Sequence, residues 1–434
     1  MSTPTTRIAF HTMGCKTNFS ETSTISNEML NHGFQKVSYR EEADIYVLNT
    51  CSVTENADKE ARKLIRQARR LNPYAKIAVI GCYAQLQPDQ ISSISGVDLV
   101  LGAAEKFNLL SHLQILSEKN ESTIISSPIN NVSSFKTSYT NGERTRSYLK
   151  VQDGCNYNCS FCTIPLARGK SRSDTIKNTV KIAQNIADSG AKEIVLTGIN
   201  IGDFGSEKDE NFLQLIMTLD NIKGIERFRI SSIEPNLLSN QIISFCAESN
   251  KFVPHFHIPL QSGSDSILQS MKRRYTTDLY KSRVQLIKKL IPDSCIGVDV
   301  ITGYPDEDED RFLETKSFLE NIDISYLHVF SYSQRNNTVA ASLKNQVTKE
   351  QKEYRSKVLH ELSNKKRTEF YNKHKNTIRS VLIEESKYGK TQGFTDNYIK
   401  VNLEEEIPIK NTIVPVLLKE NKGTYMEGEI IKNY

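Results

Sequence analysis

The sequence predicts an α/β protein in three parts: an N-terminal parallel α/β domain with three separated cysteines, a central partial (βα)6 barrel, and a small C-terminal antiparallel β-barrel. Three observations support this prediction. Apolar runs alternate with helix-like stretches in two successive series, which is typical of parallel sheets. A polar stretch at 117–144 separates the two series, and from residue 377 the pattern changes to strand-like alternation with turns. We therefore expect domains at residues 1–117, 141–372 and 373–434.

In the first series, three short apolar runs each precede a cysteine. The runs are predicted strands at Ile8–Phe10, Ile45–Leu48 and Ile77–Ile80, with helices expected at Ser20–Asn31 and Asp58–Leu71. The cysteines that follow are Cys15, Cys51 and Cys82. Ligands collect beyond the carboxyl ends of parallel strands, so the three thiols should meet there and can hold an iron–sulfur cluster with one iron open. The alternative, three separate buried cysteines, leaves their repeated placement unexplained.

The second series has six β-α steps, too few for a closed eight-stranded barrel. Strands are expected at Tyr148–Gln152, Glu193–Leu196, Arg227–Ser231, Phe256–Leu260, Ile296–Ile301 and Tyr326–Phe330. Helices are expected at Thr175–Ser189, Asn211–Leu219, Gln241–Glu248, Thr277–Leu290 and Asp310–Leu319. We therefore expect an open, partial barrel with its catalytic groups at the carboxyl ends of the strands.

The last part begins after a long basic stretch, Thr348–Lys373, that is predicted to be helical. From Thr377 onward, alternating apolar residues and turns are enough for a small barrel of about five strands. Neither internal repeats nor low-complexity tracts are found in the chain.

The most specific motif is the C-x3-C-x2-C run of Cys155, Cys159 and Cys162, just after the first predicted barrel strand. A [4Fe–4S] cube ordinarily takes four cysteines, and no fourth lies nearby. One iron would therefore be open, as in radical S-adenosylmethionine (SAM) enzymes, whose motif this run resembles: the open iron binds SAM and the cluster's electron cleaves the sulfonium bond. The alternatives are a zinc knuckle or core cysteines. Cys246 and Cys295 lack such a context and are interpreted as core residues.

Composition favours a cytoplasmic enzyme. The chain of 434 residues is 38% hydrophobic, and no apolar run approaches the length of a membrane span, so no membrane association is expected. Iron–sulfur clusters favour a reducing compartment. The net charge of +5 suits a polyanionic partner without requiring one.

Several runs in the same order give the chain a family resemblance over nearly its whole length. They are GCKTN, NTCSVT, GCYAQ, CNYNCSFC, TIPLARGKSRS, LTGIN, RISSIEP, HIPLQSGSDSIL and DVITGYPDE. Together they resemble the radical SAM methylthiotransferases, in which a three-cysteine domain precedes the radical SAM barrel and a C-terminal TRAM barrel binds RNA. GCK-x-N and I-P-x-A-R-G-x-S-R-S resemble the branch that acts on N6-threonylcarbamoyladenosine in tRNA.

The resemblance implies two [4Fe–4S] clusters and SAM in two roles. The cluster on Cys155, Cys159 and Cys162 would cleave one SAM, and a second SAM would methylate sulfur on the cluster held by Cys15, Cys51 and Cys82. The methylthio group would then pass to C2 of the adenine at position 37 of the tRNA anticodon loop. An electron donor such as flavodoxin or ferredoxin is implied, whereas the sulfur source is unknown. The residues expected to line the SAM pocket, at predicted carboxyl ends of barrel strands, are Gly198, Asn200, Ser231, Glu234 and Gln261.

Basic and aromatic residues are candidates for contacts with RNA, although each basic run is equally typical of a solvated surface. The basic candidates are Lys59, Arg62, Lys63, Arg66, Arg69, Arg70, Arg168, Lys170, Arg172, Lys365, Lys366 and Arg367. The aromatic candidates for stacking on an anticodon loop are Phe394, Tyr398 and Tyr425. His257 is interpreted as a hydrogen-bonding residue at a strand end rather than as a metal ligand.

The chain departs from the family pattern at Asp306 and Asn337, where glycine is usual, so local loop geometry near SAM is in question there. Asn tolerates a left-handed backbone, and Asp does so less often. Two alternative functions stay open: a methylthiotransferase that acts on isopentenyladenosine or on a ribosomal-protein side chain, and a non-catalytic two-cluster electron carrier.

Overall fold

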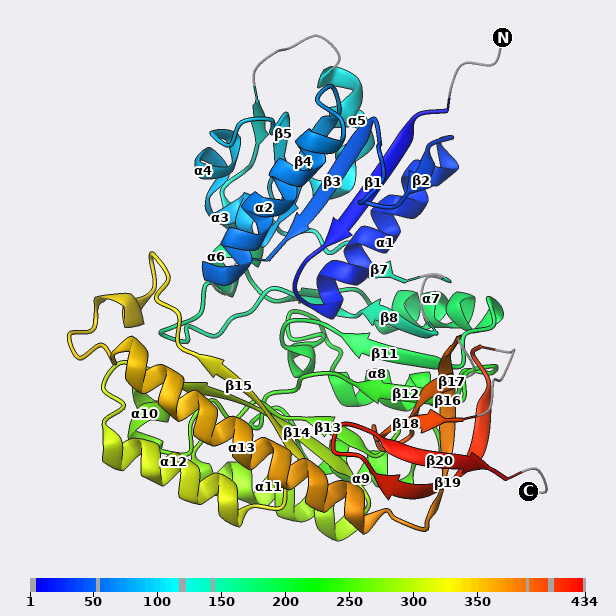
Figure 1. Cartoon of the computed structure of the whole chain (residues 1–434), viewed down its shortest axis with the longest axis vertical. Helices are drawn as coiled ribbons and strands as arrows, with labels where there is room; N and C mark the ends of the chain where they lie inside the picture. The colour runs from blue at the N-terminus through cyan, green and yellow to red at the C-terminus, as the bar shows by residue number, and fades with distance from the viewer. Residues whose placement is uncertain are drawn as a thin grey trace.

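The computed structural model describes residues 5–51, 55–116, 122–140, 142, 145–387, 390–404 and 410–431. An N-terminal α/β domain, blue to cyan in Figure 1, lies above a central open barrel, and a small barrel at the C-terminus, red, lies beside the central one. The three-part α/β fold predicted from the sequence is confirmed. Among the described residues, no helix is long and apolar enough to cross a membrane.

The N-terminal domain is a six-stranded, all-parallel sheet in the order β2-β1-β3-β4-β5-β6. Its strands are β1 Arg7–Thr12, β2 Gln35–Val37, β3 Ile45–Thr50, β4 Lys76–Gly81, β5 Leu99–Leu101 and β6 Thr123–Ile125. The three predicted strands are confirmed as β1, β3 and β4. Strand β6 extends the sheet beyond residue 117, because the segment expected as a linker pairs with β5 there.

Helices cover both faces of this sheet. Their bounds are α1 Lys16–Asn31, α2 Glu55–Leu71, α3 Cys82–Leu86, α4 Pro88–Ser92 and α5 Leu109–Ile115. Helices α1 and α5 bury Ile25 and Leu109 on one face, whereas α2 and α4 bury Ile65 and Ile91 on the other. Every residue of β3 is buried, as expected for a strand with helices on both faces.

The central part has the six predicted parallel strands. They are β8 Arg146–Lys150, β11 Glu193–Thr197, β12 Arg227–Ile230, β13 His255–His257, β14 Cys295–Thr302 and β15 Tyr326–Ser331. Two hydrogen-bonded sheets, β12-β11-β8-β7 and β13-β14-β15, are joined by parallel bridges such as Ser232↔His257. Strand β7 (Ser138–Tyr139), from the expected linker, runs antiparallel to β8 and contacts α1. Because the described strands include no pairing between β15 and β8 or β7, the barrel is open.

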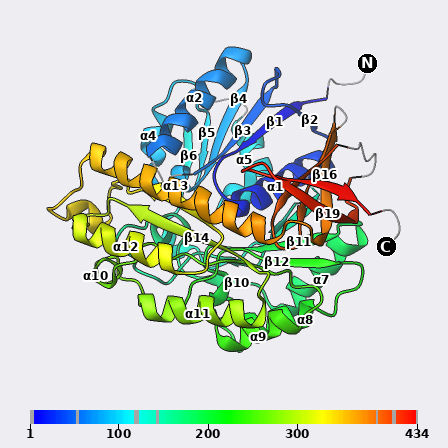
Figure 2. The ribbon, with the colours of Figure 1, turned by 60° about the horizontal axis from the view of Figure 1, so that its bottom comes forward.

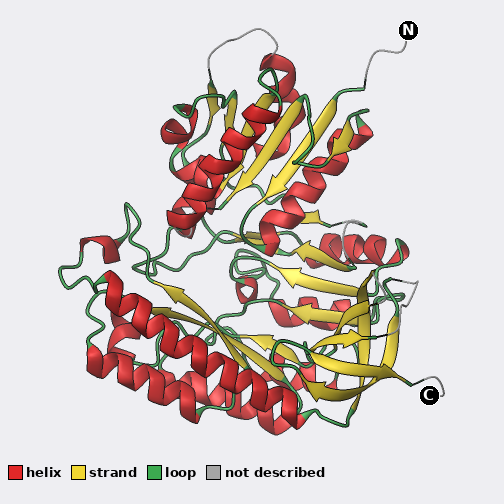
Figure 3. Ribbon diagram, in the orientation of Figure 1, coloured by secondary structure: helices red, strands yellow, loops and turns green. Residues whose placement is uncertain are grey.

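Helices lie along the outer side of the open barrel (Figure 3). They are α7 Ile176–Asp188, α8 Phe212–Leu219, α9 Asn240–Glu248, α10 Asp265–Ser270, α11 Thr277–Leu290, α12 Glu309–Asn321 and α13 Lys349–Lys373. The predicted helices are confirmed to within a few residues. The long basic helix α13 packs against β15, where Leu359 joins the same apolar core as Leu327.

The C-terminal part is a closed five-stranded barrel in the order β16-β17-β18-β20-β19. Its strands are β16 Ile378–Lys387, β17 Lys390–Thr395, β18 Lys400–Leu403, β19 Ile413–Asn421 and β20 Met426–Ile430. One pair, β18 with β20, is parallel, and the others are antiparallel. The barrel docks on the amino ends of the central strands, where Arg227 Nη2 donates to Ser380 O at 2.6 Å and Arg229 Nη1 to Asp396 O at 3.1 Å. Figure 2 shows it at the side, below the N-terminal domain.

Candidate functional site

Cys155, Cys159 and Cys162 lie on the loop between β9 (Gln152–Asp153) and α6 (Ile164–Arg168), at the carboxyl end of β8. Gly154 starts the loop with φ +73°, and a Cβ there would lie 2.0 Å from Lys170 O, so only glycine fits. The amide of Cys155 donates to Gly169 O at 3.0 Å, which closes the loop. All three thiols are free and half-buried, and they influence one another electrostatically, so they converge.

Burial raises the pKa of Cys155 to about 11 and that of Cys162 to about 12. Thiols of this kind stay protonated at neutral pH until a metal displaces the proton. Three convergent thiols with no fourth described cysteine among them fit a [4Fe–4S] cluster with one iron open.

Cys15, Cys51 and Cys82 lie at the carboxyl edge of the N-terminal sheet. Cys15 precedes α1, Cys51 follows β3, and Cys82 begins α3 directly after β4. A Cβ on Gly14 (φ +87°) would lie 2.9 Å from Cys51 Sγ, and the Cys82 thiol is influenced by Cys15, so the strand ends bring the three together. Burial raises the pKa of Cys82, against the opposing effect of Arg168. The set can hold a second cluster.

A buried ion network connects the two cysteine groups. Its members are Glu21, Lys106, Lys150, Asp153, Arg168 and Arg172, all at most 9% exposed. Arg168 Nη1, just after the Cys162 loop, lies 3.0 Å from Glu21 Oε1 on α1 and 2.9 Å from Asp153 Oδ1. Four cations face two carboxylates, and this positive excess beside Cys82 and Cys15 suits an anionic cluster on thiolates.

Two of these residues correct the sequence analysis. Arg168 and Arg172 were candidates for RNA contacts, with a solvated surface as the alternative, but both are buried, and Arg172 Nη2 lies 3.2 Å from Asp153 Oδ2. They are therefore structural cations at the domain junction. The sequence showed a basic run, and only the fold brought Glu21 and Asp153 to it.

The expected SAM-pocket residues Gly198, Asn200 and Ser231 follow β11 and β12 at the carboxyl edge. Asn200 is 2% exposed, yet its side-chain Nδ2 and Oδ1 have no hydrogen-bond partner among the described residues. Ser231 Oγ is likewise unpaired in the part of the chain described. Unsatisfied buried polar groups are costly, so their presence at a strand-end site fits a polar ligand such as SAM. Gly198 is required by packing, since a Cβ would lie 2.9 Å from Gln152 O.

Glu234 follows β12, and Gln261 follows β13. The Glu234 carboxylate pairs with Arg273, whose Nη1 donates to Cys159 Sγ at 3.1 Å. Gln261 has φ +68°, a strained conformation for a residue with a side chain, and is held by a bond from its amide to Asp299 O at 2.8 Å. Strain of this kind concentrates at ligand sites.

Sequence reasoning missed Arg273 and Gln152. Gln152 Oε1 accepts from the amides of Ile199 (3.0 Å) and Asn200 (2.8 Å), so it fixes the loop after β11. The sequence carries no signal for the role of Gln152, because its side chain contacts a loop that lies far away along the chain. Arg273 stands in the basic triplet KRR after HIPLQSGSDSIL, which was a usable signal.

The remaining RNA candidates divide into exposed and structural residues. Lys63, Arg66 and Arg70 are exposed on α2, where they line an open hollow with Arg69 and Ser95. Arg69 has a structural role, because its Nη2 forms an ion pair with Asp98 Oδ2 at 3.1 Å.

The aromatic candidates Phe394 and Tyr398 lie where the C-terminal barrel meets the central barrel. Arg146 lies over the Phe394 ring at 4.8 Å, and the Tyr398 ring lies 4.4 Å from that of His255. The Tyr398 ring therefore closes the amino end of the central barrel, and the half-buried Phe394 ring lines the pocket between the two barrels.

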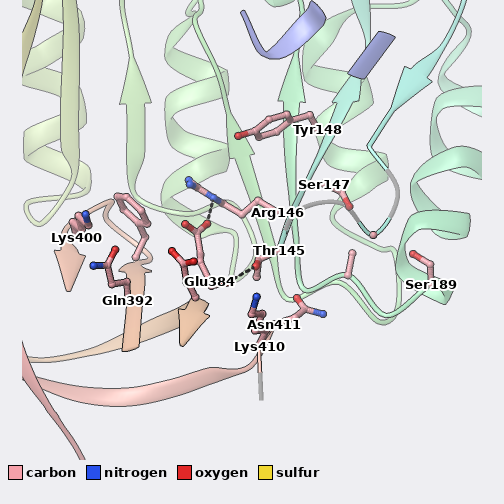
Figure 4. Close-up of a pocket in the computed structure, with 14 residues that line it drawn as sticks. Thr145, Arg146, Ser147, Tyr148, Ser189, Glu384, Gln392, Lys400, Lys410 and Asn411 are labelled. Atoms are coloured by element: carbon pink, nitrogen blue, oxygen red, sulfur yellow. Dashed lines mark hydrogen bonds and ion pairs between the residues drawn. The ribbon is translucent and has the colours of Figure 1, made fainter. Parts of the chain in front are cut away.

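A pocket of about 630 Å³ lies at this same interface, remote from the cysteines (Figure 4). Figure 4 shows Arg146 and Glu384 next to each other in its lining. They form an ion pair, with Arg146 Nε and Glu384 Oε1 2.6 Å apart. Lys400, Lys410 and Gln392, from the C-terminal part, are among the other residues that line it. Because parallel α/β barrels work at the carboxyl ends of their strands, this amino-end pocket is not the candidate active site.

Comparisons with known proteins agree with this arrangement. Residues 149–319 match the radical SAM superfamily, and residues 7–102 match the uncharacterized protein family UPF0004. Solved structures with a similar fold include the radical SAM methyltransferase TsrM from Kitasatospora setae, at a TM-score of 0.55 with 12% identity over 75% of this chain and 73% of that one. The fold and the cysteine site thus define a radical SAM protein.

Curated relatives span nearly the whole chain. The threonylcarbamoyladenosine tRNA methylthiotransferase MtaB of Bacillus subtilis (strain 168) is 38% identical over 98% of this chain and 96% of its own length. MtaB of Aquifex aeolicus (strain VF5) is 40% identical over 92% and 97%. A tRNA-2-methylthio-N(6)-dimethylallyladenosine synthase of Hydrogenobaculum sp. (strain Y04AAS1) is 30% identical over 96% and 98%. The chain belongs to the radical SAM tRNA methylthiotransferase family.

Proposed function

We propose that this protein methylthiolates C2 of N6-threonylcarbamoyladenosine at position 37 of tRNA by radical SAM chemistry. The observation that carries the proposal is the pair of three-thiol groups held in fixed relation by the Arg168–Glu21 ion pair. The relatives of 38% and 40% identity that bear the threonylcarbamoyladenosine name support the choice of substrate.

The two sites have different roles in this proposal. Cys155, Cys159 and Cys162 hold the cluster that binds SAM, and Cys15, Cys51 and Cys82 hold the cluster that carries the sulfur to be transferred. When bound, the two clusters and SAM would supply a carbon radical that can activate an unreactive C–H bond, and a methylated sulfur that replaces the hydrogen. No side-chain base in a hydrogen-bonded triad would activate such a carbon.

The chain's own residues position these groups. Asn200, Ser231 and Glu234 offer polar atoms to SAM at the carboxyl ends of β11 and β12, with Gly198 and Gln261 shaping the adjoining turns. Thr17 on α1 lies 3.5 Å from Thr197 at the end of β11 (Oγ1–Oγ1), so the residues after Cys15 rest directly on the barrel. The sulfur-bearing site therefore faces the SAM site.

The tRNA and an electron donor complete the proposal. The exposed cations of α2 lie in the three-cysteine domain and suit the phosphates of an anticodon stem-loop. An electron donor such as flavodoxin or ferredoxin would reduce the barrel cluster.

Mass spectrometry of tRNA nucleosides from cells that lack the gene tests the proposal. We expect 2-methylthio-N6-threonylcarbamoyladenosine to vanish while its precursor accumulates. Loss of the methylthio group from isopentenyladenosine, or from a ribosomal protein, would assign the enzyme to another branch of the family. Reduced protein that releases no 5′-deoxyadenosine from SAM would indicate an electron carrier instead.

A further inference from the structure

Strand β15 presents two side chains to the interior of the open barrel. Along a strand, side chains alternate between faces, and Leu327 and Val329 belong to the outer core that includes Leu359 of α13. His328 and Phe330 therefore point inward, and both are exposed, Phe330 to 48%. The interior beside them is accessible.

Two polar side chains from neighbouring strands, His257 and Asp299, lie next to His328. His257 Nε2 on β13 lies 2.8 Å from Asp299 Oδ1 on β14, which agrees with the interpretation of His257 as a hydrogen-bonding residue at a strand end. Asp299 lies opposite His328 in the β14–β15 register, and one ligand atom from each of the three lies within 4.8 Å of the others. This cluster occupies the middle of the barrel's inner face.

Lys16 enters the same interior from the N-terminal domain. It is the residue after Cys15, and the next residue, Thr17, lies 3.5 Å from Thr197 at the carboxyl end of β11 (Oγ1–Oγ1), so the start of α1 lies at the mouth of the barrel. Burial lowers the pKa of Lys16, and the nearby charges that affect it include Tyr398, Arg146, Arg229 and Asp299. Burial lowers the pKa of His328, and the charges of His257, Asp299 and Lys16 also act on it.

Two cations whose charges act on Lys16 already have carboxylate partners. Arg146 is paired with Glu384 at 2.6 Å and Arg229 with Glu193 at 2.7 Å. Lys16 has no ion pair within 4.0 Å among the residues that the structure describes, so its ammonium is available to a ligand.

We propose that Lys16, with His328, receives the carboxylate of the threonylcarbamoyl group, while the Phe330 ring lies against the adenine. This inference rests on the proposed function and identifies the residues that select its substrate. The N6 group of this nucleoside ends in a carboxylate, whereas an isopentenyl group is apolar and would leave the Lys16 charge uncompensated. The Asp299 carboxylate is an acceptor for the carbamoyl N–H groups.

The spacing along β15 suits this assignment. Two residues of a strand span about 6.6 Å, so a base held at Phe330 places a short N6 substituent beside His328. Stacking on an aromatic ring is a common way for proteins to hold an unpaired base of single-stranded RNA. Phe330 is nearer than His328 to the carboxyl end of the strand, where the SAM-pocket residues lie.

A comparison of two substrates with two enzymes tests the proposal. Reconstituted wild type and Lys16→Gln are assayed on anticodon stem-loops that carry threonylcarbamoyladenosine or its methyl ester, which lacks the charge. We expect the ester to lower kcat/KM of the wild type about tenfold or more, and the Lys16→Gln variant to lose a similar factor on the acid but to show no further loss on the ester. Iron content and 5′-deoxyadenosine release without RNA normalise each preparation, so that loss of a cluster is not mistaken for loss of recognition.

The control is Lys177→Gln, which removes an exposed lysine of α7 and should discriminate between acid and ester as the wild type does. Equal losses on acid and ester in Lys16→Gln, or a wild type indifferent to the ester, would overturn the inference. The inference would also be overturned if the purified wild type contained one zinc ion per chain and the His328→Ala variant contained none. His257, Asp299 and His328 would then be a metal site. A wild type that methylthiolates only isopentenyladenosine overturns the proposed function itself.

Discussion

Arg168 and Glu21 form a buried ion pair across the junction of the two α/β parts, with Nη1 and Oε1 3.0 Å apart and side-chain exposures of 2% and 0%. Arg168 follows the loop of Cys155, Cys159 and Cys162, and Glu21 lies on the helix that begins after Cys15. The contact thus fixes one cysteine group relative to the other. A reaction in which a group passes between two sites requires this kind of rigidity.

Arg168→Ala should destabilise the protein by about 3–5 kcal/mol, because it leaves Glu21 and Asp153 buried with fewer cations. Urea denaturation measures the change. The control is Lys192→Ala, which removes an exposed pair with Glu226 at 2.8 Å and should cost less than about 1 kcal/mol. Similar losses in the two variants would show that the junction does not depend on the network.

Cys159→Ala should abolish the absorbance of the barrel cluster and the reductive cleavage of SAM while the fold is retained. A three-thiolate site that loses one ligand binds its cube poorly. Absorbance spectra and 5′-deoxyadenosine release are the measurements, and Cys246→Ala, at a buried cysteine of α9 far along the chain, is the control. Full cleavage activity in Cys159→Ala would refute the radical SAM assignment of this site.

Cys51→Ala should separate the two sites by function. Iron content should fall by about one cluster of two, SAM cleavage should survive because the barrel site is intact, and methylthiolation should vanish. Product and 5′-deoxyadenosine are quantified in parallel on the reconstituted variant. Retained methylthio product would show that the N-terminal cysteines do not carry the sulfur, and slower SAM cleavage would point to electron transfer between the clusters.

Arg273→Gln should make the barrel cluster harder to reduce. The Arg273 guanidinium donates to Cys159 Sγ at 3.1 Å, and hydrogen bonds and positive charge near cluster sulfurs favour the reduced state. We expect a midpoint potential more negative than that of the wild type in a redox titration followed by electron paramagnetic resonance. An unchanged potential would mean that Arg273 acts only through its pairing with Glu234.

His374 makes the docking of the C-terminal barrel sensitive to acid. Burial lowers its pKa from 6.5 to about 4, and its ring is bonded to Asn397 Nδ2 at 3.1 Å, as a neutral acceptor. Between pH 6.5 and about 4 the unfolded chain binds a proton that the folded chain does not, so stability is full above pH 6.5 and falls by at most about 1.4 kcal/mol per pH unit below it. The difference in unfolding free energy between wild type and His374→Gln, measured from pH 7.5 to 4.5, should show this slope. A difference that is constant with pH would contradict it.

Two turn positions have the backbone conformation that the local sequence predicts. Asp306 and Asn337, which replace glycines of the family pattern, have φ of +66° and +64°. The left-handed conformation that glycine would supply is therefore kept. At Asp306 it is supported by a bond from Asn345 Nδ2 to the aspartate carboxylate at 2.6 Å. The Asn345 contact could not be anticipated, because it joins two loops separated along the chain.

The sequence by itself determined the α/β pattern, the two cysteine groups and the strand ends that carry them, because periodicity and motif spacing are local properties of the chain. It did not determine the partners of its charges. Arg168 and Arg172 resembled surface cations until the fold buried them beside Glu21 and Asp153, and Tyr398 resembled an RNA-stacking ring until it closed the barrel beside His255. Only the tertiary structure decided these roles, since burial and charge pairing depend on which distant segments meet.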